Sequence, residues 1–87
     1  MTESMIVRVR YFASVREALG AGDSLSLARD ATVGAVRDAL IALSPGHAQA
    51  LGRGRAVRMA LNQALCDESA TVPDGSELAF FPPVTGG

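Results

Sequence analysis

The chain has 87 residues, of which 48% are hydrophobic and 20% are charged, and its formal net charge is -1 at pH 7. This length suits one compact domain, and no apolar run is long enough to span a bilayer. The basic residues are scattered among acidic ones, so no basic patch predicts binding to nucleic acid or to an anionic membrane. The first residues, MTES, are polar and acidic, which is unlike a signal peptide, and we expect a cytoplasmic protein.

The first predicted element is a half-buried strand over residues 5–12, MIVRVRYF, in which apolar and basic side chains alternate. A short helical turn is predicted at 14–19, with Ser14 as its N-cap and Gly20 as its stop. After a GAGD turn, the alternating SLSL at 24–27 predicts a second strand. The two strands are expected to form a hairpin-like pair.

The clearest helical pattern is ATVGAVRDALIALSPG, in which Thr32 is the expected N-cap and Ser-Pro-Gly the expected stop. Its apolar residues recur at helical spacing, namely Val33, Val36, Leu40 and Leu43. Residues 47–54 are expected to add one more helical turn before a glycine-rich loop.

The rest of the chain reads as strands. Apolar residues alternate in AVRMAL, and Asn62-Gln63 predicts a tight reversal into a very short strand at 64–66. A loop ending in Pro-Asp-Gly leads to the last strand, ELAFF at 77–81. This order predicts an α+β, β-grasp fold with a mixed sheet of about five strands covered by one main helix. The predicted domain spans 1–81, and 82–87 form an extended flexible tail.

Two residue types that often carry chemistry occur once each. Cys66 alone cannot form an internal disulfide or a thiolate cluster, so we expect a small, at least half-buried strand residue. His47, in an SPGH turn without a neighbouring carboxylate pattern, is expected to be a solvent-facing loop residue. No metal site is predicted.

The C-terminal FFPPVTGG differs from an ordinary frayed end. If Leu78 and Phe80 enter the core, the period of two leaves Phe81 on the outer face. Pro82 and Pro83 then end the sheet ladder and stiffen the exit of the chain. Beyond them, the side-chain-free Gly86 and Gly87 could enter a narrow channel, and the free carboxylate of Gly87 is the only group on this arm suited to covalent chemistry.

Three segments, RYFASVREALG, ALNQALC and PDGSELAFFPPVTGG, resemble the opening strand, middle hairpin and closing strand with tail of one family. That family is the small, sulfur-carrying subunit of molybdopterin synthase, a group of ubiquitin-like proteins, and the resemblance covers essentially the whole chain. Two departures concern partner contacts: Ser76 stands where many members have an acidic residue, and every basic residue here is arginine. Two explanations for the missing lysines remain open. The composition has drifted towards arginine, or side-chain amines are excluded because they could attack a reactive acyl group carried by the protein.

The resemblance implies that Gly87 is adenylated and then converted to a thiocarboxylate, with Gly86 as the slim residue that lets it enter an active site. It implies three partners: the large synthase subunit, an E1-like adenylating enzyme that uses ATP, and a sulfur donor protein. The chain itself is expected to bind no cofactor and to be non-catalytic alone, as the sulfur-donating subunit of a sulfurtransferase that acts on cyclic pyranopterin monophosphate. Residues expected to contact partners are Phe12, Phe81, Pro82, Pro83, Val84 and Thr85.

Other functions remain open on the sequence alone. A carrier with this end could serve thiazole, cysteine or transfer-RNA thiolation pathways instead. The chain could also be a ubiquitin-like modifier that attaches Gly87 to target lysines, or an interaction module whose glycine ending is idle.

Overall fold

The computed structural model describes residues 4–83. The elements are β1 (Ser4–Tyr11), α1 (Ala13–Leu19), β2 (Gly22–Ala28), α2 (Val33–Ile41), α3 (Pro45–Leu51), β3 (Arg58–Leu61), β4 (Ala64–Cys66) and β5 (Glu77–Phe81). Every predicted strand is present, the short one at 64–66 included. The tight reversal at Asn62 and Gln63 is also confirmed, with φ of 49° and 72°.

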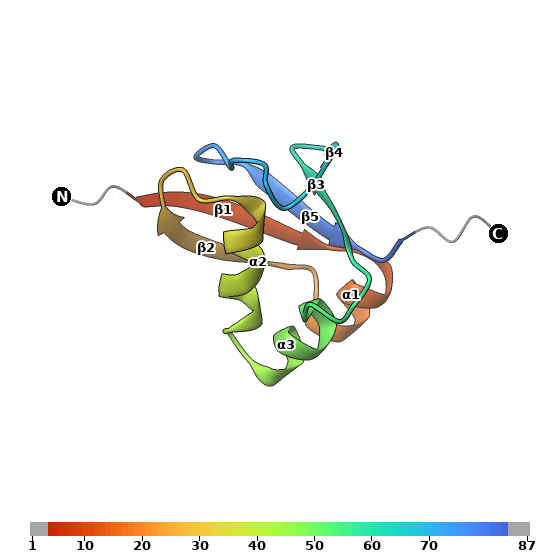
Figure 1. Cartoon of the computed structure of the whole chain (residues 1–87). Helices are drawn as coiled ribbons and strands as arrows, with labels where there is room; N and C mark the ends of the chain where they lie inside the picture. Colours follow the sequence, from red (N-terminus) through yellow and green to blue (C-terminus); the bar gives the residue numbers. More distant parts are fainter. Residues whose placement is uncertain (1–3, 84–87) are drawn as a thin grey trace.

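The strands form one five-stranded sheet in the order β2-β1-β5-β3-β4. The two central strands, β1 and β5, run parallel, and the other pairs are antiparallel. All three helices lie on the same side of the sheet (Figure 1). This arrangement confirms the predicted β-grasp fold, with α2 as the longest helix and α1 and α3 sharing the covered face.

Alternation along the strands sorts side chains between the core and the outside. On β1, Met5, Val7, Val9 and Tyr11 are each at most 3% exposed, while the residues between them face outward. On β5, Leu78 and Phe80 are fully buried, as predicted. The core between sheet and helices is therefore set by the period of two on the strands and by the helical spacing of Val33, Val36 and Leu40.

Helix α2 begins as predicted and ends earlier. The Thr32 hydroxyl accepts a hydrogen bond from the Ala35 N–H at 3.2 Å, which is the expected N-cap. Leu43 was predicted on the apolar stripe, but the helix ends at Ile41 and Leu43 is 48% exposed. The prediction for Leu43 was wrong because helical spacing has no meaning beyond the last turn.

The short helices also differ from the prediction in how they begin. Helix α1 has Phe12 as its N-cap, with no side-chain cap, so Ser14 lies inside the helix; Gly20, with φ of 91°, ends it as predicted. The Ser-Pro-Gly predicted as a stop opens α3 instead. Ser44 accepts a hydrogen bond from the His47 N–H, and Pro45 occupies the first turn, where its missing N–H costs nothing.

Candidate functional site

The sheet face opposite the helices carries Phe12 and Phe81, two of the predicted partner-contact residues. In the ladder, Arg10 on β1 lies opposite Ala79 on β5, and Ala79 lies opposite Ala60 on β3, so the two neighbouring strands β5 and β3 present small side chains beside Arg10. They form the floor of a groove of about 480 Å³, which we call the outer groove. Its lining residues are Arg10, Phe12, Ala60, Gln63, Glu77, Ala79 and Phe81.

Phe12 and Phe81 are brought together at this groove. Phe12 is 39% exposed, and Phe81 is partly buried. The Arg10 guanidinium lies 5.6 Å from the centre of the Phe12 ring, close enough for a cation–π contact, and 3.8 Å from a Glu77 carboxylate oxygen. The groove thus combines aromatic surface with one exposed ion pair, although the role of both phenylalanines in partner binding stays a prediction.

The apolar surface continues to the edge of the sheet. Leu65 on β4 lies opposite Ala60, so it shares the outer face, and it is 71% exposed. The sequence reasoning missed Leu65, Arg10 and Gln63 as lining or flanking residues. The alternation of Ala64, Leu65 and Cys66 was the available signal, because Cys66 lies opposite the buried Met59 and Leu65 must then point the other way.

The chain leaves the sheet beside the outer groove. The Phe12 N–H donates a hydrogen bond to the Phe80 carbonyl at 3.1 Å, which fixes the end of β5 next to the start of α1 (Figure 1). Phe81 makes the last strand pair, opposite Arg58, and Pro82 and Pro83 follow without N–H groups to extend the ladder. The predicted site residues Val84, Thr85, Gly86 and Gly87 lie outside the described residues.

A polar cluster around His47 contradicts the prediction that this residue is a solvent-facing loop residue. This residue lies in α3 with its side chain 15% exposed, and its Nε2 is 2.8 Å from the Asp23 carboxylate on β2. Its Nδ1 lies 2.7 Å from the Ser44 hydroxyl, and the buried Tyr11 donates its hydroxyl to the same Asp23 oxygen at 2.7 Å. The cluster links α3 to β1 and β2. Burial is the main cause that raises the pKa of the Tyr11 phenol, and the Asp23 carboxylate raises it further, so Tyr11 remains a hydrogen-bond donor.

We predict that Asp23→Asn destabilises the domain in a pH-dependent way. Partial burial opposes ionisation of Asp23, but the hydrogen bonds from His47 and Tyr11 outweigh it and lower its pKa below the ordinary value. A lowered folded-state pKa contributes stability above the unfolded value near ~4, and this contribution is lost as pH falls through the folded pKa. Urea unfolding should therefore show the variant about 1 kcal/mol less stable at pH 6, with the gap closing below pH ~4. A gap that does not change with pH would contradict this origin.

Cys66 is a partly buried residue of β4, as predicted. Burial raises the pKa of its thiol, which favours the unreactive protonated form. Within residues 4–83, no group of three or more histidine, cysteine, aspartate or glutamate side chains could hold a metal ion. Nor does that part of the chain include a helix long and apolar enough to cross a membrane.

These features define the class of protein: a ubiquitin-like β-grasp domain with an open, partly aromatic sheet face and a chain that leaves the sheet beside it. Residues 9–87 match the ThiS family, and the chain belongs to that family. It is 43% identical over 83 residues to the molybdopterin synthase sulfur carrier subunit of Escherichia coli K12, and 42% identical over 83 residues to the protein of the same name in Haemophilus influenzae. Each alignment covers 94% of this chain and 100% of the relative.

Solved structures agree with this grouping. The crystal structure of small archaeal modifier protein 1 from Haloferax volcanii is similar with a TM-score of 0.75 and 27% identity, covering 92% of this chain and 99% of that one. A chain in the complex of subunits 1 and 2 of the molybdopterin-converting factor from Helicobacter pylori has a TM-score of 0.64 and 26% identity, covering 95% of this chain and 100% of that one.

Proposed function

We propose that this chain is a sulfur carrier for the synthesis of molybdopterin. The observation that carries the proposal is the identity of 42% and 43% with two molybdopterin synthase sulfur carrier subunits over their full length. The outer groove supports it, because a partner seated there would lie beside the point where the C-terminal arm leaves the sheet. The carrier brings the sulfur to a large synthase subunit, and that partner supplies the catalytic groups.

The chemistry begins with a carboxylate, which is a poor electrophile. An oxygen of Gly87 attacks the α-phosphorus of ATP on an E1-like partner enzyme and releases pyrophosphate, which gives an acyl-adenylate. The terminal sulfur of a donor protein's persulfide then attacks the acyl carbon and AMP leaves. A thiol cleaves the resulting acyl disulfide, which leaves a thiocarboxylate on Gly87 as a soft nucleophile for cyclic pyranopterin monophosphate. ATP is bound by the partner, and this chain holds no cofactor of its own in the scheme.

The decisive measurement is the intact mass of the chain produced together with its activating enzyme and a persulfide donor. We expect a species in which one oxygen is replaced by sulfur and which fragmentation places on Gly87. A variant without Gly87 should keep its fold and give no such species. Absence of the sulfur-bearing species from the full chain, under conditions where the adenylate forms, would contradict the carrier function.

Contact through the outer groove gives a second expected outcome. Phe81→Ala should weaken binding to the large synthase subunit about tenfold or more, because a half-exposed aromatic in a groove supplies much of the buried area of such a contact. Leu43→Ala is the matched control, since Leu43 is also a large exposed apolar residue but follows α2 on the helix side. Calorimetric titration of both variants checks this, and equal weakening in the two would contradict a specific role for the groove.

A ubiquitin-like modifier is the second candidate function, favoured by the similarity to small archaeal modifier protein 1. The two functions differ in the fate of the activated Gly87. A modifier forms an amide bond to a lysine amine of another protein, whereas a carrier ends as a thiocarboxylate and returns to a carboxylate after transfer. Recovery of this chain from its native cells in amide-linked adducts would favour the modifier. A carrier that serves thiazole, cysteine or transfer-RNA thiolation instead would be identified by the acceptor that receives the sulfur.

A further inference from the structure

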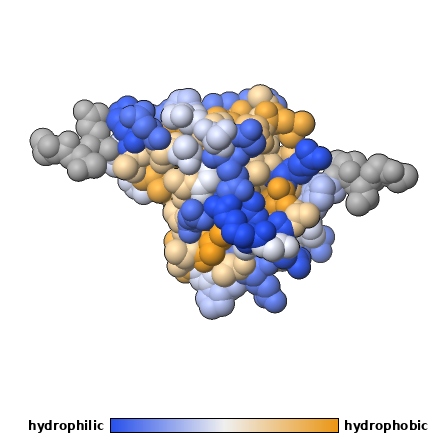
Figure 2. Space-filling model, viewed as in Figure 1, coloured by the Kyte–Doolittle hydropathy of each residue, from blue (hydrophilic) through white to orange (hydrophobic). Residues whose placement is uncertain are grey.

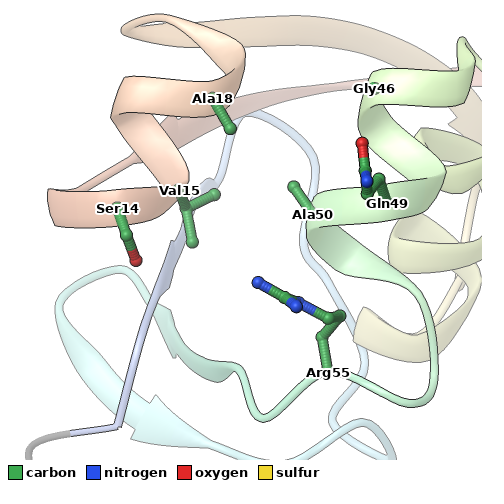
Figure 3. Close-up of a pocket in the computed structure, with 7 residues that line it drawn as sticks. All are labelled: Ser14, Val15, Ala18, Gly46, Gln49, Ala50 and Arg55. Carbon is green, nitrogen blue, oxygen red and sulfur yellow. The ribbon is translucent and has the colours of Figure 1, made fainter.

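A second cavity lies on the helix side of the molecule, away from the outer groove. It has a volume of about 270 Å³ and lies between α1 and α3; we call it the helical cleft. Its lining residues are Ser14, Val15, Ala18, Gly46, Gln49, Ala50 and Arg55. Figure 3 shows apolar side chains of both helices pointing toward the same space, with the Arg55 side chain reaching into it from the loop after α3.

The charge on Arg55 is not neutralised by its neighbours. Two other arginines lie nearby: Arg37 is 3.3 Å from a Glu68 carboxylate oxygen, and Arg53 bonds to the other Glu68 oxygen and to Asp38 at 2.5 Å. Two carboxylates therefore balance these two guanidinium groups. Figure 2 shows the resulting hydrophilic patch on the face between α2 and the segment after α3. Within the described residues, the Arg55 guanidinium makes no hydrogen bond or ion pair, so one positive charge remains at the cleft.

The backbone of the loop that carries Arg55 is held in place by hydrogen bonds from Arg37. The buried Arg37 donates to the carbonyls of Leu51 at 2.7 Å, Gly52 at 3.0 Å and Arg55 itself at 3.3 Å. The Arg55 N–H also donates to the Gly52 carbonyl at 2.8 Å. The backbone of Arg55 is thus fixed before any ligand arrives, which lowers the entropy cost of binding.

We propose that the helical cleft binds a small carboxylate, whose two oxygens pair with the Arg55 guanidinium while a short aliphatic stem lies against Val15 and Ala50. A planar guanidinium matches the two oxygens of a carboxylate, and the alanine and valine side chains offer only apolar surface to the stem. The volume suits a ligand of a few carbon atoms. Such a carboxylate could come from a free short-chain acid or from the C-terminal carboxylate of Gly87.

The test is a titration of the isotopically labelled full chain with acetate, propionate and butyrate at constant ionic strength. The Arg55 Nε–Hε resonance should shift and saturate, with a dissociation constant on the order of 1 mM. Each added methylene should tighten binding about fourfold until the cleft is full, because the stem is buried against apolar side chains. A shift that does not saturate and is the same for all three acids would reflect ionic screening and overturn the proposal.

Three variants separate the cleft from general charge effects. Arg55→Gln should lose about tenfold or more in affinity, because it removes a charged hydrogen-bond partner. Arg16→Gln makes the same change of charge on an exposed α1 residue that does not line the cleft, and it should leave the affinity within about twofold. Ala18→Leu should fill the cleft and abolish binding with Arg55 intact. Equal losses for the two arginine variants would overturn the proposal.

The two sources of the carboxylate are distinguished by the titration of Gly87 itself. If Gly87 is the ligand, the pKa of its carboxyl group lies lower in the unmodified chain than in the Arg55→Gln variant, and propionate removes the difference. If the ligand is a free acid, the pKa of Gly87 is the same in both chains while propionate still shifts Arg55. Either result supports the site, and loss of the saturable Arg55 response in the unmodified chain excludes both.

Discussion

Arg37→Met is expected to lower the free energy of unfolding by about 3–5 kcal/mol, because each of the two buried carbonyls left without a donor costs about 1–3 kcal/mol and the pair with Glu68 is lost as well. Arg37 is 4% exposed, and its guanidinium satisfies the carbonyls of Leu51 and Gly52 at the end of α3 together with Glu68. Methionine fills a similar volume but donates no hydrogen bond, so these carbonyls would be left without their donor. Burial and the neighbouring Arg53 lower the pKa of Arg37, but a guanidinium remains protonated at neutral pH.

Urea unfolding measures this loss, and Arg53→Met is the matched control. Arg53 bonds to Asp38 and Glu68 as well, but its side chain is 47% exposed, so its removal should cost less than about 1 kcal/mol. A domain of this size has a total stability of roughly 4–13 kcal/mol, so the Arg37 variant should lose about a quarter of it or more. Similar losses in the two variants would show that the exposed ion pairs, rather than the buried carbonyl contacts, hold α3.

Phe80→Ala is expected to cost about 3–5 kcal/mol of folding stability, whereas the adjacent Phe81→Ala should cost less than about 1 kcal/mol. Phe80 is fully buried, lies opposite Tyr11 on β1 and Met59 on β3, and packs with its ring centre 6.4 Å from that of Tyr11. Its truncation opens a cavity at the centre of the sheet. Phe81 points to the outer face and keeps one side in solvent.

The pair is informative because the two residues are the same type and neighbours in sequence. Thermal unfolding of both variants, followed by partner binding under conditions where both are folded, separates stability from recognition. Phe80→Ala should melt at a lower temperature, and Phe81→Ala should bind more weakly. The reverse pattern would mean that the alternation on β5 has been assigned to the wrong faces.

Local patterns predicted the strands and the main helix because the residues that decide them are close in sequence. Thr32 caps α2 through a contact three residues away, and the alternation in β1 and β5 fixes which side chains are buried. Ser44 was misread for a physical reason. A proline ends the preceding helix by excluding the helical conformation from the residue before it, but it also suits the first turn of a new helix. Ser44 is extended, with φ of -164°, and caps α3, whereas α2 has already ended at Ile41.

The sites required contacts between residues far apart in sequence. His47 and Asp23 meet only because α3 packs against the end of the β1–β2 pair, which no local pattern encodes. The floor of the outer groove depends on the register that sets Ala60 opposite Ala79. Phe81 could be assigned to the outer face from its own strand, whereas Arg10, Gln63 and Leu65 needed the order of all five strands.

The parallel pairing of β1 with β5 has a consequence for biosynthesis. The last described strand fills the gap between β1 and β3, so the sheet has two unconnected parts until residues 77–81 have been synthesised. A nascent chain that stops earlier lacks both the central strand and the wall of the outer groove formed by Phe81. Recognition through this surface would therefore discriminate chains that have formed β5 from shorter ones without any separate proofreading step.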